Sequence, residues 1–408
     1  MPEAIVGDAR RQLRQIGILL GLLTAIGPTA IDLYLPALTA IAHDLNAGPS
    51  AVQATLISFF YALVVGQVIA GPIADIYGRR RPLIAGLLLF LIASIACALA
   101  PDIETLIAAR FFQGLGACVG VAISRAVVRD LRAGAAAAGL MATITLVSGV
   151  SPVFAPMLGS GLLLLVDWRG IFWVIAIATA LLTILVLARL PETHPPSARA
   201  EAGFRPAIAI YARLLRDPRF VRLSCASAMA MSLSFAFLAG APYVYAELYG
   251  FSPWGVASML VLNGVCQIGV AQLNPSLIRR FGPWAVVRWA FAGMIGVAAV
   301  LLLLWWFGGV IPVQPLLVLV ALIYMGIGLL LAPLTILILE PLGRVAGTGS
   351  ALVGILQLGS GATVGALVSF THDGTPGPMI AAMIGCILAG AIAARMAHAI
   401  KPAATAGN

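Results

Sequence analysis

The chain contains a series of apolar runs, each long enough to cross a lipid bilayer. A helix needs about 20 apolar residues to span the hydrocarbon core, so each run predicts a transmembrane helix. Their length and their richness in Leu, Ala, Ile and Gly favour helices over the ~10-residue alternating strands of a membrane barrel. The runs lie at about 16–38, 51–73, 83–100, 104–127, 137–165, 170–190, 220–245, 252–275, 284–308, 312–338, 345–370 and 376–397.

Composition supports an integral membrane protein and argues against a soluble one. Hydrophobic residues make up 61% of the 408 residues and charged residues only 10%. Soluble domains are about 45–50% apolar and about 25% charged. The formal net charge of +9 therefore reflects membrane topology. A nucleic-acid partner would require a soluble basic domain, which the sequence lacks.

The placement of basic residues predicts the orientation in the membrane. Of the 24 Lys and Arg residues, all but Arg110 and Arg169 lie at the termini or at every second loop and the helix ends beside it. These places all fall on the same side of the membrane. Basic residues concentrate on the cytoplasmic side of membrane proteins. Both termini and the 191–219 connection are therefore expected to be cytoplasmic.

The 191–219 segment is the one marked change in composition along the chain. It is rich in proline, polar and basic residues, and we interpret it as a cytoplasmic linker with a short helix at the membrane surface. The predicted organisation is a six-helix bundle over 1–190, this linker, and a second six-helix bundle over 220–408.

Two short internal repeats support this division. Tyr77-Gly78 after the second run resembles Phe281-Gly282 after the eighth, and the Leu-Gly-Ser-Gly sequence at 158–161 recurs at 358–361. Each pair joins a helix to the helix six positions later. This pattern predicts two pseudo-symmetric halves related about the membrane normal.

Cysteine, histidine and lysine patterns argue against enzyme chemistry. All five cysteines lie within apolar runs without a C-x-x-C motif, and no histidine is near mid-membrane, so neither a metal site nor a disulfide frame is expected. The only lysine, Lys401, precedes Pro402, so there is no phosphate-binding loop for ATP. An intramembrane enzyme is the alternative class, but no nucleophile and base pattern supports it. We predict no enzyme activity and no cofactor.

Two ionisable residues lie within the predicted spans and are functional candidates because charge is costly there. Asp32 and Arg110 are each about six residues from the outer ends of the first and fourth runs, or ~9 Å deep. Equal depth suggests an electrostatic link, direct or through a relay such as Gln113. The alternative is a fixed structural ion pair or two side chains that extend to the interface.

The loop between the second and third runs resembles the signature loop of the major facilitator superfamily, with its G-x-x-x-D-x-x-G-R-R spacing. Its glycines would let two helices approach and reverse, and its arginines would hold the loop at the cytoplasmic surface. Asp75 is expected to face a helix N-terminus of the second half, and Arg79 or Arg80 to reach Asp130, when the cytoplasmic side is closed. The residues of this predicted cytoplasmic gate are Gly71, Asp75, Gly78, Arg79, Arg80 and Asp130.

Further segments resemble the Bcr/CflA family of drug:proton antiporters over nearly the whole chain. They are Leu33–Ala37, Arg110–Gly114, Arg125–Asp130, Glu340–Gly343 and Ala346–Ser350. The antiporter motif of helix 5 is altered, because Ala155-Pro-Met-Leu-Gly-Ser160 stands where Gly-Pro-x-x-Gly-Gly is usual. Small residues there still allow a bent helix to pack closely. The motif residues are Pro152, Ala155, Pro156 and Gly159.

The resemblance implies a monomeric exporter in the bacterial inner membrane, driven by the proton gradient without a cofactor or metal, that moves small amphipathic drugs by alternating access. Asp32 would carry the proton, with Arg110 as its partner and Gln113 as a relay. A nutrient importer, or an exporter of a native metabolite or siderophore, remains an alternative. The candidate cavity residues are Tyr34, Tyr61, Arg125, Phe154, Phe235, Asn263, Gln267 and Gln357.

Overall fold

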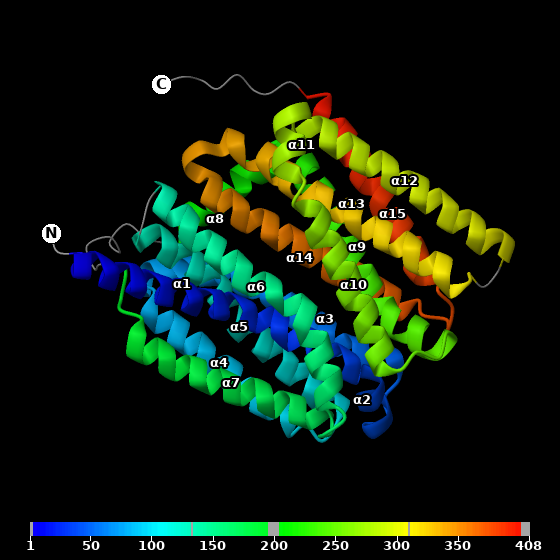
Figure 1. The fold of residues 1–408 in the computed structure, drawn as a ribbon, viewed down its shortest axis with the longest axis horizontal. Coiled ribbons are helices and arrows are strands. Elements are labelled where there is room, and N and C mark those ends of the chain that lie inside the picture. Colours follow the sequence, from blue (N-terminus) through cyan, green and yellow to red (C-terminus); the bar gives the residue numbers. More distant parts are fainter. Residues whose placement is uncertain (1–2, 132–133, 195–203, 309–310, 401–408) are drawn as a thin grey trace. The chain divides into compact units, whose positions relative to one another are not determined.

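The computed structural model describes residues 3–131, 134–194, 204–308 and 311–400, and this part of the chain is helical with no strand (Figure 1). The chain divides into two compact units, 1–204 and 205–408, with the border inside the predicted linker. The helices of the first unit are α1 (Glu3–Asp32), η1 (Leu35–Ala37), α2 (Leu38–Asp44), α3 (Pro49–Tyr77), α4 (Arg80–Ala98), α5 (Ile103–Leu131), α6 (Gly134–Leu162) and α7 (Trp168–Arg189). Those of the second unit are α8 (Phe204–Arg216), α9 (Pro218–Tyr243), η3 (Val244–Leu248), α10 (Pro253–Ala271), α11 (Asn274–Phe281), α12 (Pro283–Gly308), α13 (Val313–Leu339), η4 (Glu340–Val345), α14 (Ala346–Phe370) and α15 (Gly377–His398).

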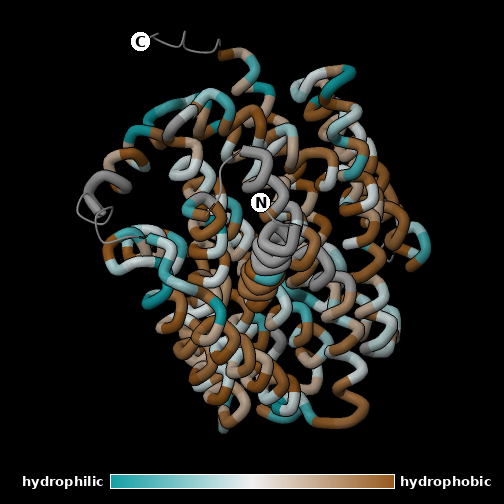
Figure 2. The backbone as a smooth tube through the Cα atoms, turned by 60° about the vertical axis from the view of Figure 1, so that its left-hand side comes forward, coloured by the Kyte–Doolittle hydropathy of each residue, from teal (hydrophilic) through white to brown (hydrophobic). Residues whose placement is uncertain are grey.

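The helices confirm the predicted class of fold. Among the described residues, 11 helical segments are long and apolar enough to cross a membrane, and the 29-residue helix α6 occupies the place of the remaining predicted span. Hydrophobic residues run along the long helices, and many hydrophilic residues lie at their ends (Figure 2). The chain is therefore an all-α, multi-pass membrane protein.

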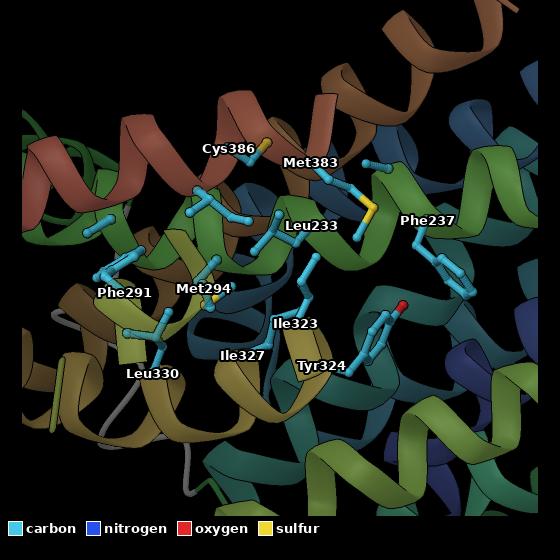
Figure 3. Close-up of a cluster of buried hydrophobic side chains, with 14 of the residues drawn as sticks. Leu233, Phe237, Phe291, Met294, Ile323, Tyr324, Ile327, Leu330, Met383 and Cys386 are labelled. Carbon is cyan, nitrogen blue, oxygen red and sulfur yellow. The ribbon is translucent and has the colours of Figure 1, made fainter. Parts of the chain in front are cut away.

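Each unit is held together by its own helix contacts. In the first, α5 packs against α3 and α4, and α1 packs against α6. In the second, α9 packs against both α14 and α15, while α13 packs against α10 and α12. A buried cluster of aliphatic, aromatic and sulfur-containing side chains fills the second unit, with Phe237, Met294 and Tyr324 among its members (Figure 3).

The first span differs from the single helix that was predicted over 16–38. The helix α1 contains Pro28 and ends at Asp32, and the span continues through η1 and α2 to Asp44. Asp32 is therefore twelve residues from the outer end of its span, whereas Arg110 is seven residues from the start of α5. The prediction of equal distance from the span ends was wrong, because the first span extends to Asp44, six residues beyond the predicted end of the run at 38.

Both internal repeats have structural counterparts. Gly78 ends α3 with φ of 89°, and Gly282 ends α11 with φ of 77°. Residues with a side chain rarely adopt this backbone conformation. The second repeat lies on α6 and α14, and each of these helices packs against the first long helix of its own unit. Both repeats therefore occupy equivalent places in the two units, and Gly78 and Gly282 are the C-terminal caps of their helices.

Candidate functional site

Asp32 lies at the point where the first span loses its helical geometry. Its oxygen Oδ2 is shielded from solvent and has no hydrogen-bond partner among the described residues. Within the described spans, no other acidic residue lies more than a helical turn from a span end. An unpaired carboxylate oxygen is costly in such surroundings, and taking up a proton removes the cost. A carboxyl group in this position can bind and release a proton.

Arg110 is fully buried in the first unit, with an exposed fraction of 0%. Its guanidinium carbon lies 4.7 Å from the ring centroid of Tyr34, 4.4 Å from that of Phe59 and 5.8 Å from that of Phe172. Aromatic faces attract a desolvated guanidinium. The cation is thus held mainly by aromatic rings from α3, from α7 and from the turn that follows α1.

Hydrogen bonds link Arg110 to α4. Its Nη1 donates to Oε1 of Gln113 at 2.5 Å, Nε2 of Gln113 donates to the Ser94 hydroxyl at 2.8 Å, and that hydroxyl donates to the Phe90 carbonyl at 2.6 Å. Nε and Nη2 of Arg110 have no partner in the described part of the chain. Ser94 was not identified from the sequence, although it is the one serine or threonine residue in the run 83–100.

The hydrogen bonds that Arg110 forms do not connect it to Asp32. No ion pair joins the two residues among those described, so the direct form of the predicted link is absent from this structure. Tyr34, two residues after Asp32, instead places its ring against Arg110 and shares a 2.6 Å hydrogen bond with Thr55. Since Thr55 donates to the Val52 carbonyl, the Tyr34 hydroxyl is the donor of that bond.

Arg110→Lys and Arg110→Ala test this arrangement. We expect the Lys variant to retain part of the transport rate, because an ammonium keeps the charge but not the planar contact with the rings, and the Ala variant to lose nearly all of it. If Arg110 acts on Asp32, losing the cation makes the carboxyl group hold its proton to higher pH, so the pH midpoint of transport moves upward. Transport by folded protein across a pH series measures both. An unchanged midpoint in Arg110→Ala would leave Arg110 only a structural role.

The antiporter motif on α6 packs directly against the break after Asp32. A methyl group added at Gly159 would overlap the Leu33 carbonyl oxygen, so the two backbones touch. Ala155 and Pro156 are also buried. The Pro152 side chain lies outside the described residues. The motif and Asp32 were predicted separately, and the fold brings them together.

The loop between α3 and α4 forms an ionic network inside the first unit. Arg79, only 4% exposed, donates from Nη1 to Asp75 and from Nε to Asp130 Oδ2 at 2.8 Å. The predicted contact with Asp130 is thus present. It joins two residues of the first unit, whereas the prediction tied it to closure of the cytoplasmic side. The expected close approach at Gly71 is absent, since an added methyl group would meet no described atom within 4 Å.

Glu192 completes this network and was not identified from the sequence. Its carboxylate accepts from the backbone N–H of Arg79 at 2.8 Å and of Arg80 at 3.3 Å, at the start of α4. A carboxylate at a helix N-terminus satisfies free N–H groups and is favoured by the helix dipole. Arg80 also donates to the Leu187 carbonyl at 2.7 Å. The only sequence signal was an acidic residue two positions after the end of the sixth run.

Asp130→Asn should destabilise the protein more than Asp75→Asn. The Asp130 side chain is 18% exposed and that of Asp75 is 47% exposed, so water compensates the loss of Asp75 better. We expect the loss of Asp130 to cost about 1–2 kcal/mol, less than for a fully buried pair. Melting temperatures of the purified variants measure this, with exposed Glu104→Gln as the control. Equal melting temperatures for all three would contradict the proposed anchoring of Arg79.

The eight candidate cavity residues differ in exposure. Tyr34 is fully buried, and Phe235 and Asn263 are 6% and 3% exposed, so these three lie within their units. Gln267 and Gln357 are half-buried, and Gln357 donates to the Ser227 hydroxyl of α9 at 2.8 Å. The exposed candidates are Tyr61, Arg125 and Phe154.

The fold and site together define a class of protein: a multi-pass helical membrane protein in two units with a buried charge centre in the first. Residues 20–366 match the family model described as Major Facilitator Superfamily. The chain therefore belongs to the major facilitator superfamily of membrane transporters, as the signature loop predicted.

Relatives of the chain carry drug-resistance names. It is 35% identical to the uncharacterized MFS-type transporter YdgK of Bacillus subtilis, over 93% of this chain and 94% of that one. It is 30% identical to multidrug resistance protein D of Escherichia coli (94% and 97% covered) and 28% identical to the bicyclomycin resistance protein homolog of Haemophilus influenzae (92% and 94%). These names agree with the predicted resemblance to the Bcr/CflA family.

The overall fold is also that of solved transporters. The D-xylose-proton symporter superimposes with a TM-score of 0.71 at 16% identity, over 96% of this chain and 98% of that one. At this level of identity the likeness concerns the fold alone.

Proposed function

We propose that this chain exports small amphipathic drugs across the bacterial inner membrane by proton-coupled antiport. The observation that carries the proposal is Asp32, a deep, partly unpaired acid at a helix break that the antiporter motif contacts through Gly159. Names of relatives that refer to multidrug and bicyclomycin resistance support efflux rather than uptake.

In the proposed cycle, the two units rock around a central path, with both termini and the 191–219 connection in the cytoplasm. Asp32 takes up a proton from the outer side, where a drug is released, and gives it up to the cytoplasm. A membrane potential supplies about 2.3 kcal/mol per charge per 100 mV, which is enough for uphill export of a membrane-soluble drug. The monomer is the proposed working unit, and the exposed candidates Tyr61, Arg125 and Phe154 are proposed to contact the drug.

Within this cycle, the network around Arg79 would act as a rigid anchor for the cytoplasmic end of the first unit. We propose that Asp75 also approaches the start of α14 when the cytoplasmic side is closed. Asp75→Asn would then favour the inward-open form and slow turnover without weakening drug binding. Spin-label distances between 74–82 and 339–345 report on this, and an unchanged distance distribution would contradict it.

A susceptibility panel in an efflux-deficient bacterial host tests the function. Expression of the chain should raise the inhibitory concentration of bicyclomycin, chloramphenicol or a related amphipathic compound at least fourfold, and Asp32→Asn should remove the increase. In inside-out vesicles, an imposed proton gradient should drive uptake of the same compound. Increased susceptibility would instead indicate import, while a panel without any change would favour export of a native metabolite or siderophore.

A further inference from the structure

A groove of ≈ 550 Å³ in the second unit runs between α12 and α15, which lie side by side in Figure 1. The Trp284 and His398 rings meet at its mouth, with centroids 4.6 Å apart, so α12 begins where α15 ends. Arg288 and Arg395 line the groove about one turn further along their helices, from opposite walls. Beyond the arginines the lining is apolar and includes the exposed side chains of Ile295 and Ile392.

The two arginines lack a counter-ion among the residues that the structure describes. Neither guanidinium forms a hydrogen bond or ion pair with any described residue, and α12 and α15 contain no Asp or Glu. The ion pairs found in the described chain all lie in the first unit, where Arg79 and Arg169 are paired with aspartates. Both arginines are exposed, and like charges on facing walls of one groove repel each other, so an anion between them is favourable.

We propose that this groove binds an anionic glycerophospholipid, with its phosphate between Arg288 and Arg395. Basic pockets between membrane helices recognise anionic headgroups. Trp284 at the mouth suits the headgroup level, where aromatic rings concentrate. From Arg288 to Ile295 the helix rises ~10 Å, so an acyl chain leaving the phosphate follows the apolar part of the groove. Free inorganic phosphate would leave that apolar part unfilled, which favours a lipid.

The binding is measured by native mass spectrometry of the full chain in detergent, with phosphatidylglycerol and phosphatidylcholine of identical acyl chains as probes. The parent should prefer phosphatidylglycerol. The double variant Arg288→Gln/Arg395→Gln should reduce this preference by about 25-fold, or about 5-fold for each arginine. The matched control Arg279→Gln/Arg280→Gln removes the same charge from α11, outside the groove, and should stay within twofold of the parent.

Ala292→Trp provides a second test that changes no charge. Ala292 lines the apolar part of the groove, so an indole there should displace the acyl chain and lower retention of phosphatidylglycerol even if the double arginine variant does not fold. Equal losses in the groove and control variants would show only diffuse attraction and would overturn the proposal. Unchanged retention in Ala292→Trp, or displacement of the lipid by millimolar inorganic phosphate, would overturn it as well.

Discussion

Asp32→Asn is expected to abolish transport driven by an imposed pH gradient while drug binding stays within a few-fold of the parent. Asparagine has nearly the same shape as a protonated aspartate but cannot exchange a proton, so the coupling step is lost and the packing is kept. The position at the end of α1, with Oδ2 unpartnered, makes the amide easy to accommodate. Drug uptake into proteoliposomes with an imposed gradient, and equilibrium binding in detergent, measure the two effects separately.

Asp102→Asn is the matched control for this experiment. Asp102 lies in the turn before α5, and the hydrogen bond from the Thr105 backbone N–H holds the pKa of its carboxyl group below its usual range. It therefore stays ionised during transport and should not carry a proton, so the control should keep gradient-driven transport. Normal gradient-driven transport in Asp32→Asn would exclude Asp32 as the proton carrier.

Gly159→Ala should cause the second large loss. In an open helix position alanine is favoured over glycine by about 1 kcal/mol. At Gly159 the added methyl group would overlap the Leu33 carbonyl, so α6 must move away from the break that follows Asp32. Overpacking of this kind costs about 1–3 kcal/mol. We expect a lower melting temperature and a transport rate reduced at least tenfold, measured on equal amounts of folded protein.

The control for this change lies two residues away on the same helix. An added methyl group at Gly161 meets no described atom within 4 Å. Gly161→Ala should therefore leave transport and the melting temperature near those of the parent. If both alanine variants behave alike, the contact between Gly159 and Leu33 has no special role, and the antiporter motif acts only through its general flexibility.

Helix positions were largely predictable because each span must satisfy its backbone hydrogen bonds internally and cover them with apolar side chains. The predicted run 284–308, for example, matches α12 (Pro283–Gly308) to within one residue. The first span was predicted less well. Hydropathy does not distinguish a continuous helix from one that breaks at Asp32 and resumes at Leu35, since both are equally apolar.

The site was predictable as a set of residues but not as a set of contacts. Asp32 and Arg110 stand out in sequence because charge is costly in a membrane. Their partners do not, because Phe59 and Phe172 look like ordinary apolar residues until the fold places their rings against a guanidinium. Glu192 is a similar case, since its role depends on α4 beginning beside it in space, more than 100 residues away in the chain.

The class of protein, most of its spans, its internal repeat and its family follow from the amino-acid sequence, because hydropathy and local motifs are properties of neighbouring residues. The folded chain was needed to find that Arg110 is held by aromatic rings and Gln113, without an ion pair to Asp32. It was also needed to find that Gly159 touches the backbone beside Asp32. The physical reason is that such contacts join helices far apart in the chain, and their geometry depends on how whole helices bend and pack, which no local pattern encodes.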